Sequence, residues 1–431
     1  MISLQARFRV SAVRSVHVLG QRSFTSQLRA IEGSKDLLLH GKYPGSAREG
    51  SISSVHQFLC RSHPSKNAPE TVISKVGRRL HLRDGHPLYI IKKRIEAYLL
   101  QESQRGKWGV DLDVHDDLNP VVDPKSCFDD LRVAKDHVSR RPSDTYYLSD
   151  EYLLRTHTSA HQNHFISSMP KDGGGAFVVS GDVYRRDEID SSHYPVFHQM
   201  EGVRIWNNKD VADDEIARDL KLVLGGLAEH LFGKDIEMRW NEDYFPFTEP
   251  SFELEVKFED KWLEVLGCGV VHKEVMEMAH QDGKKGWAFR LGLERLAMVL
   301  FGIPDIRLFW SEDERFHEQF RDVDPADFSK KLPRFNPYSR YPGCWKDVSF
   351  WLPSQDLHQN DVYEVIRGIG GDLVERVELF DEFTHKKTGK TSHAYRITYR
   401  HMDRSLTNEE VDSVQFQVRD ALSSKLGVEL R

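Results

Sequence analysis

The sequence predicts an α+β protein with two folded domains, and two observations carry this prediction. Residues 176–185 (AFVVSGDVYR) and 196–206 (VFHQMEGVRIW) are rich in β-branched and aromatic residues, and a polar loop separates them. This pattern indicates two strands joined by a long loop. Residues 334–431 alternate between strand and helix patterns in the order strand, helix, strand, strand, helix. This is the order of a ferredoxin-like (split βαβ) fold.

Length and composition bound the possible functions. The chain has 431 residues, which is enough for two or three domains, and its net charge is -7. This charge gives no general attraction to nucleic acid, so any such contact must come from a local basic patch. No apolar run is long enough for a membrane span, so no membrane partner is expected. The four cysteines lie far apart, which argues against a zinc site and a disulfide framework.

The first 31 residues differ in composition from the rest of the chain. They contain five arginines and several serines, and the first acidic residue is Glu32. This composition is typical of a mitochondrial transit peptide and predicts a location in the mitochondrial matrix, whereas the alternative is a disordered basic tail. Residues 32–75 are expected to be a linker or lead-in, because stretches such as GKYPGSAREGS are rich in turn-forming residues.

An amphipathic helix is predicted at 86–100 (HPLYIIKKRIEAYLL). Its apolar residues recur at helical spacing, with three basic residues on the other side. Pro87 suits a first helical turn. Further along, four stretches concentrate polar, aromatic or glycine residues: RTHTSAHQ (155–162), YFPFTEPSFELEV (244–256), KWLEVLGCGVV (261–271) and GWAFRLGLERLAMVLFGIPDIR (286–307). The third is expected to be a strand, and the fourth a strand followed by a helix from about Leu293.

Taken in order, these segments resemble a known family. HPL with its helix, VYRRD with FHQMEG, and LGLERLAM are similar to motifs 1, 2 and 3 of class II aminoacyl-tRNA synthetases. RTHTSAHQ, FPFTEPS and LEVLGCG narrow the resemblance to phenylalanyl-tRNA synthetases of the single-chain mitochondrial type. The resemblance implies a class II catalytic domain at 76–310, an antiparallel sheet flanked by helices. It also implies a connector at 311–333 and a ferredoxin-like anticodon-binding domain at 334–431.

In the implied reaction, ATP activates phenylalanine with release of pyrophosphate, and the amino acid is then transferred to tRNA. The site must therefore hold two anions, the carboxylate and the α-phosphate, together with the ammonium group of the amino acid. The resemblance assigns Arg185, Arg295 and His193 as catalytic, with Asp187 and Phe197 completing the ATP site. Arg185 would bridge the α-phosphate and the carboxylate, because a guanidinium fork suits both. Phe197 and Arg295 would hold the adenine between them. Glu264 is a candidate Mg²⁺ ligand. The residues implied to bind phenylalanine are His157, Ser159, Gln162, Gln199, Glu201, Phe245 and Phe247.

A basic stretch in the C-terminal domain is the candidate tRNA contact. Residues 385–404 contain two tyrosines, Tyr395 and Tyr399, interleaved with basic side chains, and a basic, aromatic strand face suits single-stranded RNA. The predicted tRNA-binding residues are Lys386, Lys387, Lys390, Arg396 and Arg400.

One position departs from the family pattern. Arg290 stands in GWAFRLGLER where the third motif normally has glycine, and a long charged side chain there can point away, bind a phosphate or block the pocket. The resemblance therefore implies a monomeric phenylalanine–tRNA ligase of mitochondria that uses ATP and Mg²⁺, with tRNA(Phe) and phenylalanine as partners. The alternatives are a non-catalytic tRNA-binding paralogue, with its site altered by Arg290, and a class II-like ligase acting on another acceptor.

Overall fold

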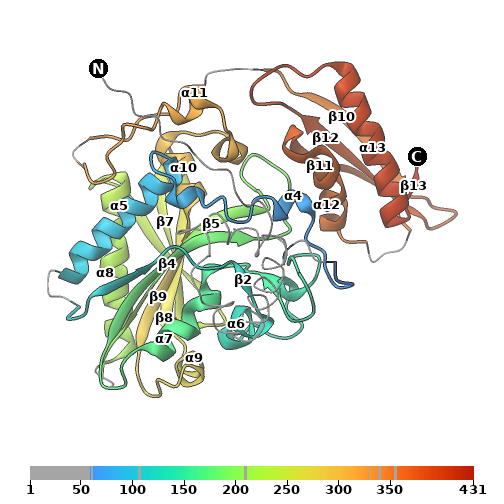
Figure 1. Ribbon diagram of the computed structural model, residues 1–431. Helices are drawn as coiled ribbons and strands as arrows, with labels where there is room; N and C mark the ends of the chain where they lie inside the picture. Colours follow the sequence, from blue (N-terminus) through green and yellow to red (C-terminus); the bar gives the residue numbers. More distant parts are fainter. Residues whose placement is uncertain are drawn as a thin grey trace, which may run out of the picture.

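The computed structural model describes residue 59 and residues 62–104, 108–207, 211–328, 330–337, 341–353 and 357–431. The predicted transit peptide at 1–31 and most of the predicted lead-in lie outside these residues. Figure 1 shows a large domain, coloured blue to yellow, beside a smaller C-terminal domain in orange and red. No helix in the described part of the chain has the length and apolar character needed to cross a membrane.

The large domain is built on a seven-stranded sheet with the order β1-β4-β5-β9-β8-β7-β6. Only β1 runs parallel to its neighbour, and the other pairs are antiparallel, which confirms the predicted antiparallel sheet. A separate pair, β2 with β3, lies outside this sheet. The strands are β1 Leu112–His115, β2 Val121–Val122, β3 Leu153–Leu154, β4 Gly175–Tyr184, β5 Val196–Ile205, β6 Met238–Phe245, β7 Thr248–Phe258, β8 Lys261–Val271 and β9 Gly286–Gly292.

Helices cover both faces of this sheet, as alternation along the strands requires. On β5, Met200 packs in the apolar core shared with α5 and α8, whereas Val203 and Ile205 pack in a second cluster with α7 and α9. Gln199 and Glu201 have the same parity as Val203, so they lie on the face opposite to α5 and α8. The α-helices are α4 Glu70–Ile73, α5 Pro87–Glu102, α6 Pro124–Cys127, α7 Gln162–Ser168, α8 Asp213–Phe232, α9 Lys273–Met278, α10 Leu293–Phe301 and α11 Glu314–His317.

Short 3₁₀ helices connect these elements, and the predicted local elements are confirmed. The helix predicted at 86–100 is α5, and the side chain of His86 caps it by accepting a hydrogen bond from the backbone N–H of Leu88. The predicted strands are β4 and β5, paired from Gly175↔Ile205 to Tyr184↔Val196. The 3₁₀ helices are η1 Leu80–Leu82, η3 Asp129–Leu131, η4 Val138–Arg140, η5 Thr158–His161, η6 Ile306–Trp310 and η7 Gly371–Leu373.

The C-terminal domain has the predicted ferredoxin-like order. Its four-stranded antiparallel sheet has the order β11-β12-β10-β13, and α12 packs against α13. Thr407 and Glu410 form a capping box at the start of α13. The elements are β10 Cys344–Trp351, α12 Gln359–Gly370, β11 Val374–Thr384, β12 Thr391–Tyr399, α13 Asn408–Leu426 and β13 Glu429–Leu430.

The end of the predicted lead-in belongs to the folded large domain. Val72 and Ile73 of α4 are fully buried in its core. The side chain of Asn67 donates hydrogen bonds of 2.9 Å to the backbone oxygens of Pro142 and Thr145. Composition predicted that residues 62–75 lie outside the domain, because polar and turn-forming residues surround the short apolar helix in this segment.

The two domains meet at the loop between β4 and β5, which we call the motif 2 loop (residues 185–195). Ile189 of this loop is buried in the apolar core of the C-terminal domain. Its backbone oxygen accepts a 2.9 Å hydrogen bond from the backbone N–H of Val377. Arg186, also in the loop, forms ion pairs of 3.1 Å with Asp361 and 3.6 Å with Glu364. The C-terminal domain therefore packs directly against a loop that the sequence assigns to the catalytic site.

Candidate active site

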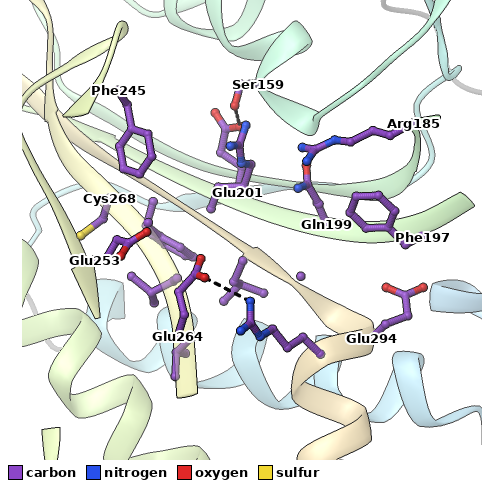
Figure 2. Close-up of a pocket in the computed structure, with 18 of the residues that line it drawn as sticks. Ser159, Arg185, Phe197, Gln199, Glu201, Phe245, Glu253, Glu264, Cys268 and Glu294 are labelled. Atoms are coloured by element: carbon purple, nitrogen blue, oxygen red, sulfur yellow. Dashed lines mark hydrogen bonds and ion pairs between the residues drawn. The ribbon is translucent and has the colours of Figure 1, made fainter. Parts of the chain in front are cut away.

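Nearly all residues predicted to bind ATP and phenylalanine line one pocket on the sheet face that carries Gln199 and Glu201. Figure 2 shows Phe245 and Phe197 at opposite ends of this pocket, with Glu201, Gln199 and Arg185 between them. Of the predicted set, His157 alone is absent from the lining. The predicted residues that line the pocket are Ser159, Gln162, Arg185, Asp187, His193, Phe197, Gln199, Glu201, Phe245, Phe247, Glu264 and Arg295.

Arg185 lies just beyond the end of β4 and presents its guanidinium to the pocket. Its Nε atom donates a 2.8 Å hydrogen bond to the backbone oxygen of Thr156, and the guanidinium lies 5.3 Å from the centre of the Phe197 ring. Burial and the neighbouring Arg290 lower the pKa of Arg185 to about 10, so it stays charged near neutral pH. The anchored Nε leaves the two terminal nitrogens available for an anion.

The centre of the pocket offers acceptors for a cation. Glu201 is buried, and its Oε2 atom accepts hydrogen bonds from the hydroxyls of Ser159 and Thr158. Buried oxygens of Gln162, Gln199 and Glu201 have no hydrogen-bond partner among the residues that the structure describes. Because buried polar atoms are normally paired, these three oxygens indicate a ligand with several N–H donors. An ammonium group has three.

Burial changes the titration of this acceptor site. It raises the pKa of Glu201 to about 7. The carboxyl group in the empty pocket is therefore only partly ionised near neutral pH. A bound cation would favour the ionised form and lower this pKa again.

An aromatic wall closes one end of the pocket. The rings of Phe245 and Phe247 are stacked, with centroids 5.9 Å apart and planes 11° apart. Phe245 ends β6, whereas Phe247 lies in the turn before β7, so these two residues are not alternate residues of one strand. Gly267 makes room for this wall, because a Cβ atom there would lie 2.8 Å from the Phe245 ring.

The opposite end carries Phe197 and charged side chains. Arg295 of α10 forms a 3.1 Å ion pair with Glu264 of β8, drawn as the dashed line from Glu264 in Figure 2. Glu253 of β7 also lines the pocket, and burial together with the carboxylate of Glu264 raises its pKa. Two nearby carboxylates in a pocket with arginines suit a divalent cation that bridges to phosphate oxygens. Among the described residues, no third acidic or histidine ligand joins Glu264.

His193 and His157 have different surroundings. His193 is exposed on the motif 2 loop, and its Nδ1 atom lies 2.8 Å from Asp190, which raises the pKa of the imidazole. A protonated imidazole at the pocket edge suits an anion. His157 is buried behind the pocket wall, with Nε2 3.9 Å from the sulfur of Cys127. Burial and the charges of Arg290 and Arg185 hold the pKa of His157 well below its usual range.

Arg290, the position that departs from the family pattern, also lines the pocket. It lies on β9, directly opposite Glu201 on β5 and Gly267 on β8. Its guanidinium is 5.9 Å from the centre of the Phe247 ring. The side chain therefore lies in the pocket and adds a positive charge to it.

Sequence reasoning missed Thr158, Glu253 and one positioning pair. Thr158 stands beside Ser159 in the dense stretch RTHTSAHQ, and Glu253 follows the period-two pattern of SFELEV, so both had a signal. Glu294 of α10 accepts 2.7 Å hydrogen bonds from the backbone N–H of His198 and lies 2.7 Å from its ring nitrogen. This pair ties the helix after β9 to the strand that carries Phe197 and Gln199, and it depends on a contact between distant segments.

The C-terminal basic patch is less available than its sequence suggests. Lys390 pairs with Glu429 at 3.1 Å, Arg396 with Asp347 at 2.8 Å and Arg400 with Glu375 at 2.8 Å. Lys386 and Lys387 are exposed in the turn between β11 and β12, and they make no ion pair with the residues that the structure describes.

The expectation that Tyr395 and Tyr399 share a surface with the arginines is wrong. Both tyrosines are buried in the domain core. Residues of opposite parity on a strand point to opposite faces, so Arg396 and Arg400 project from the other side of β12. The exposed face instead carries Trp345 and Phe380, which lie on either side of Arg396 at 4.1 Å and 4.9 Å.

Comparison with known proteins identifies both domains. Residues 86–320 match the family model of the class II tRNA synthetase core domain (F), and residues 339–431 match the ferredoxin-fold anticodon-binding domain. The chain is 50% identical over 374 residues to the chloroplastic/mitochondrial phenylalanine–tRNA ligase of Arabidopsis thaliana, covering 85% of this chain and 83% of that protein.

Two further relatives agree over similar lengths. The mitochondrial phenylalanine–tRNA ligase of Mus musculus is 46% identical over 418 residues, covering 90% of this chain and 91% of the relative. The one of Dictyostelium discoideum is 45% identical over 410 residues, with 85% and 89% covered. With a pocket lined by residues of the second and third class II motifs and with two matching domains, the chain belongs to the class II aminoacyl-tRNA synthetases, in the phenylalanine–tRNA ligase family.

Proposed function

We propose that the protein activates L-phenylalanine with ATP and transfers it to tRNA(Phe) for mitochondrial translation. The observation that carries the proposal is the arrangement of the pocket. Unpaired buried oxygens on Gln162, Gln199 and Glu201 match an ammonium group. The guanidinium fork of Arg185 matches an anionic group next to this ammonium group. The stacked rings of Phe245 and Phe247 match an aromatic side chain. An aromatic amino acid has these three features in this order.

Activation joins two anions, and the arginines reduce their repulsion. A carboxylate oxygen of phenylalanine attacks the α-phosphorus of ATP. The bond from that phosphorus to the bridging oxygen breaks, and pyrophosphate leaves with the electron pair. Arg185 stabilises the charge that spreads over the α-phosphate in the transition state. Its Nε–H bond to Thr156 fixes the fork, so no reorganisation is needed as this charge develops.

The remaining pocket residues hold the nucleotide. Adenine lies against Phe197 and beneath Arg295, whose cation favours the ring face. Asp187 contacts the adenine amino group or the tRNA end. The imidazolium of His193 binds the outer phosphates. Mg²⁺ fits beside Glu264 and Glu253, because magnesium bound with phosphates needs only one or two protein carboxylates; it would neutralise phosphate charge there.

The C-terminal domain supplies the contact with the tRNA anticodon. Its candidate residues are the exposed Lys386 and Lys387, followed by Lys390, Arg396 and Arg400, which would have to exchange an acidic partner for phosphate. One chain carries both catalytic and anticodon modules, so we infer a monomer. The relatives' names support a mitochondrial location, and the arginine-rich N-terminus supports the matrix. A non-catalytic paralogue is not favoured, because the pocket keeps its unpaired polar groups.

Phenylalanine-dependent exchange of pyrophosphate into ATP tests the proposal, followed by charging of tRNA(Phe). The unmodified protein should catalyse both, and Glu201→Gln should weaken exchange through its phenylalanine KM. Arg218→Gln is a matched control, because Arg218 is exposed on α8 on the opposite side of the sheet. Exchange that is absent in a folded protein would favour the non-catalytic paralogue. Exchange without charging of any tRNA would favour another acceptor.

A further inference from the structure

Arg290 places a partly buried cation in the pocket. It makes no hydrogen bond and no ion pair with any residue that the structure describes, and its guanidinium lies 5.9 Å from the centre of the Phe247 ring. The side chain is partly buried, and its guanidinium, with five N–H donors, lines the space that a ligand would fill. Its position on the pocket floor therefore indicates an anionic ligand.

The neighbouring strands present opposite charges side by side. Arg290 and Glu201 are direct cross-strand partners, and such partners have Cβ atoms about 5 Å apart on the same sheet face. Arg290 favours the ionised form of Glu201, but no hydrogen bond or ion pair joins the two side chains, because the carboxylate of Glu201 is turned to the hydroxyls of Ser159 and Thr158. A free amino acid carries its ammonium and carboxylate groups on one carbon, so its charge pattern complements this pair.

We propose that Arg290 binds the α-carboxylate of the amino acid substrate, which leaves the fork of Arg185 for the α-phosphate of ATP. The inference rests on the proposed function and divides the two anions between two guanidiniums. Arg185 has only two free terminal nitrogens, because Nε is bound to Thr156. A bidentate contact to one anion uses both of them. A second arginine therefore allows each anion a fork of its own.

The same geometry admits a competing outcome. The guanidinium stands near Phe247, at the wall proposed for the substrate ring. If Arg290 filled the ring position, it would compete with every ligand that has a phenyl group. The two arrangements predict opposite effects of removing the side chain, so one measurement separates them.

The experiment compares L-phenylalanine with L-phenylalaninol, which keeps the ammonium and the ring but has an alcohol in place of the carboxylate. Calorimetric binding is measured with the full chain and with Arg290→Gln, Arg290→Lys and the control Arg218→Gln. Arg290→Gln should weaken phenylalanine about tenfold or more, the cost of losing charged hydrogen bonds. Phenylalaninol should change by about twofold or less. Arg290→Lys should recover part of the loss, because it keeps the charge without the fork.

Retained phenylalaninol binding shows that each variant has a folded pocket. Equal weakening of both ligands would overturn the carboxylate contact, and tighter binding of both would mean that Arg290 occupies the ring position. A full chain that binds phenylalanine but shows no exchange would contradict the proposed activity without contradicting this inference. Steady-state pyrophosphate exchange is a second measurement. In it, Arg290→Gln should raise the KM for phenylalanine and change the KM for ATP by about twofold or less.

Discussion

The Nη2 atom of Arg367 in α12 donates a 2.6 Å hydrogen bond to the backbone oxygen of Asp187 in the motif 2 loop. The same nitrogen lies 3.3 Å from the backbone oxygen of Glu188, and Nη1 is 3.0 Å from Glu364 within α12. Together with buried Ile189, this contact fixes the loop that carries the proposed ATP contacts Asp187 and His193. The anticodon-binding domain is thus also a support for the nucleotide site.

This contact changes the outcome expected for the isolated catalytic domain. Sequence organisation alone predicts that truncation before residue 334 leaves adenylate formation largely intact. The structure predicts instead that truncation lowers pyrophosphate exchange about tenfold or more, because Ile189 becomes exposed and the loop loses its hydrogen bonds. Unchanged pyrophosphate exchange in a folded truncated protein would mean that the catalytic domain works independently of the C-terminal domain.

A single substitution gives a milder version of the same test. Arg367→Ala removes the hydrogen bonds to the loop backbone and should raise the KM for ATP several-fold, with a smaller effect on the KM for phenylalanine. Arg376→Ala is the matched control, since Arg376 is exposed on β11 and pairs with Glu378 of the same strand. An equal effect of both variants would mean that the loop does not depend on Arg367.

Arg185→Ala should lower the rate of activation about a hundredfold or more, as the loss of a main donor to transition-state charge does. Arg185→Lys should rescue little, because an ammonium group cannot form the fork. Single-turnover measurement of phenylalanyl-adenylate formation separates this effect from binding. A near-normal rate in the alanine variant would exclude the proposed role.

Glu201 should make phenylalanine binding depend on pH. Its pKa is about 7 in the empty pocket, and an ammonium group needs the ionised carboxylate. Below pH 7, kcat/KM for phenylalanine should therefore rise about tenfold per pH unit, and it should level off above pH 7. Glu201→Gln should remove this slope while lowering the value at high pH. A profile that is the same in both proteins would assign the titration to another group.

The same shift has a consequence for stability, with the sign fixed by proton binding. The usual pKa of this side chain is 4.5, so between pH 4.5 and 7 the folded protein holds a proton that the unfolded chain releases. The contribution of Glu201 to the free energy of unfolding therefore falls as pH rises through this window. Denaturant titrations of the full chain and Glu201→Gln at pH 5 and pH 7 measure it.

The sequence predicted those features that depend on local pattern. Period-two alternation placed Gln199 and Glu201 on one face of β5, and motif order gathered the pocket residues. The same rule, applied to β12, would have separated Tyr395 and Tyr399 from Arg396 and Arg400, because their parity differs. The support of the motif 2 loop by Arg367 could not be read from the sequence, because the two segments are distant along the chain. Nor could composition show that Phe247 lies in a turn rather than a strand.

The accessible lysines of the C-terminal domain should carry more of the tRNA affinity than its arginines. Lys386 and Lys387 lie exposed in the β11–β12 turn and form no ion pair within the described part of the chain, whereas Arg396 and Arg400 pair with Asp347 and Glu375. Replacing both lysines with alanine should weaken binding of tRNA(Phe) and lower the slope of log affinity against log salt by about two units or less. Pyrophosphate exchange should stay unchanged, because these lysines lie in the C-terminal domain and are not among the residues that line the active-site pocket.

The matched control for the lysine pair is Arg396→Ala with Arg400→Ala, measured across the same salt series. If these arginines serve the domain's own ion pairs, their loss should lower its thermal stability and leave the salt slope nearly unchanged, because no phosphate contact disappears. A larger loss of slope in the arginine pair than in the lysine pair would mean that RNA displaces Asp347 and Glu375. The open sheet face beside Trp345 and Phe380 would then be the RNA-binding surface, with Arg396 held between the two rings.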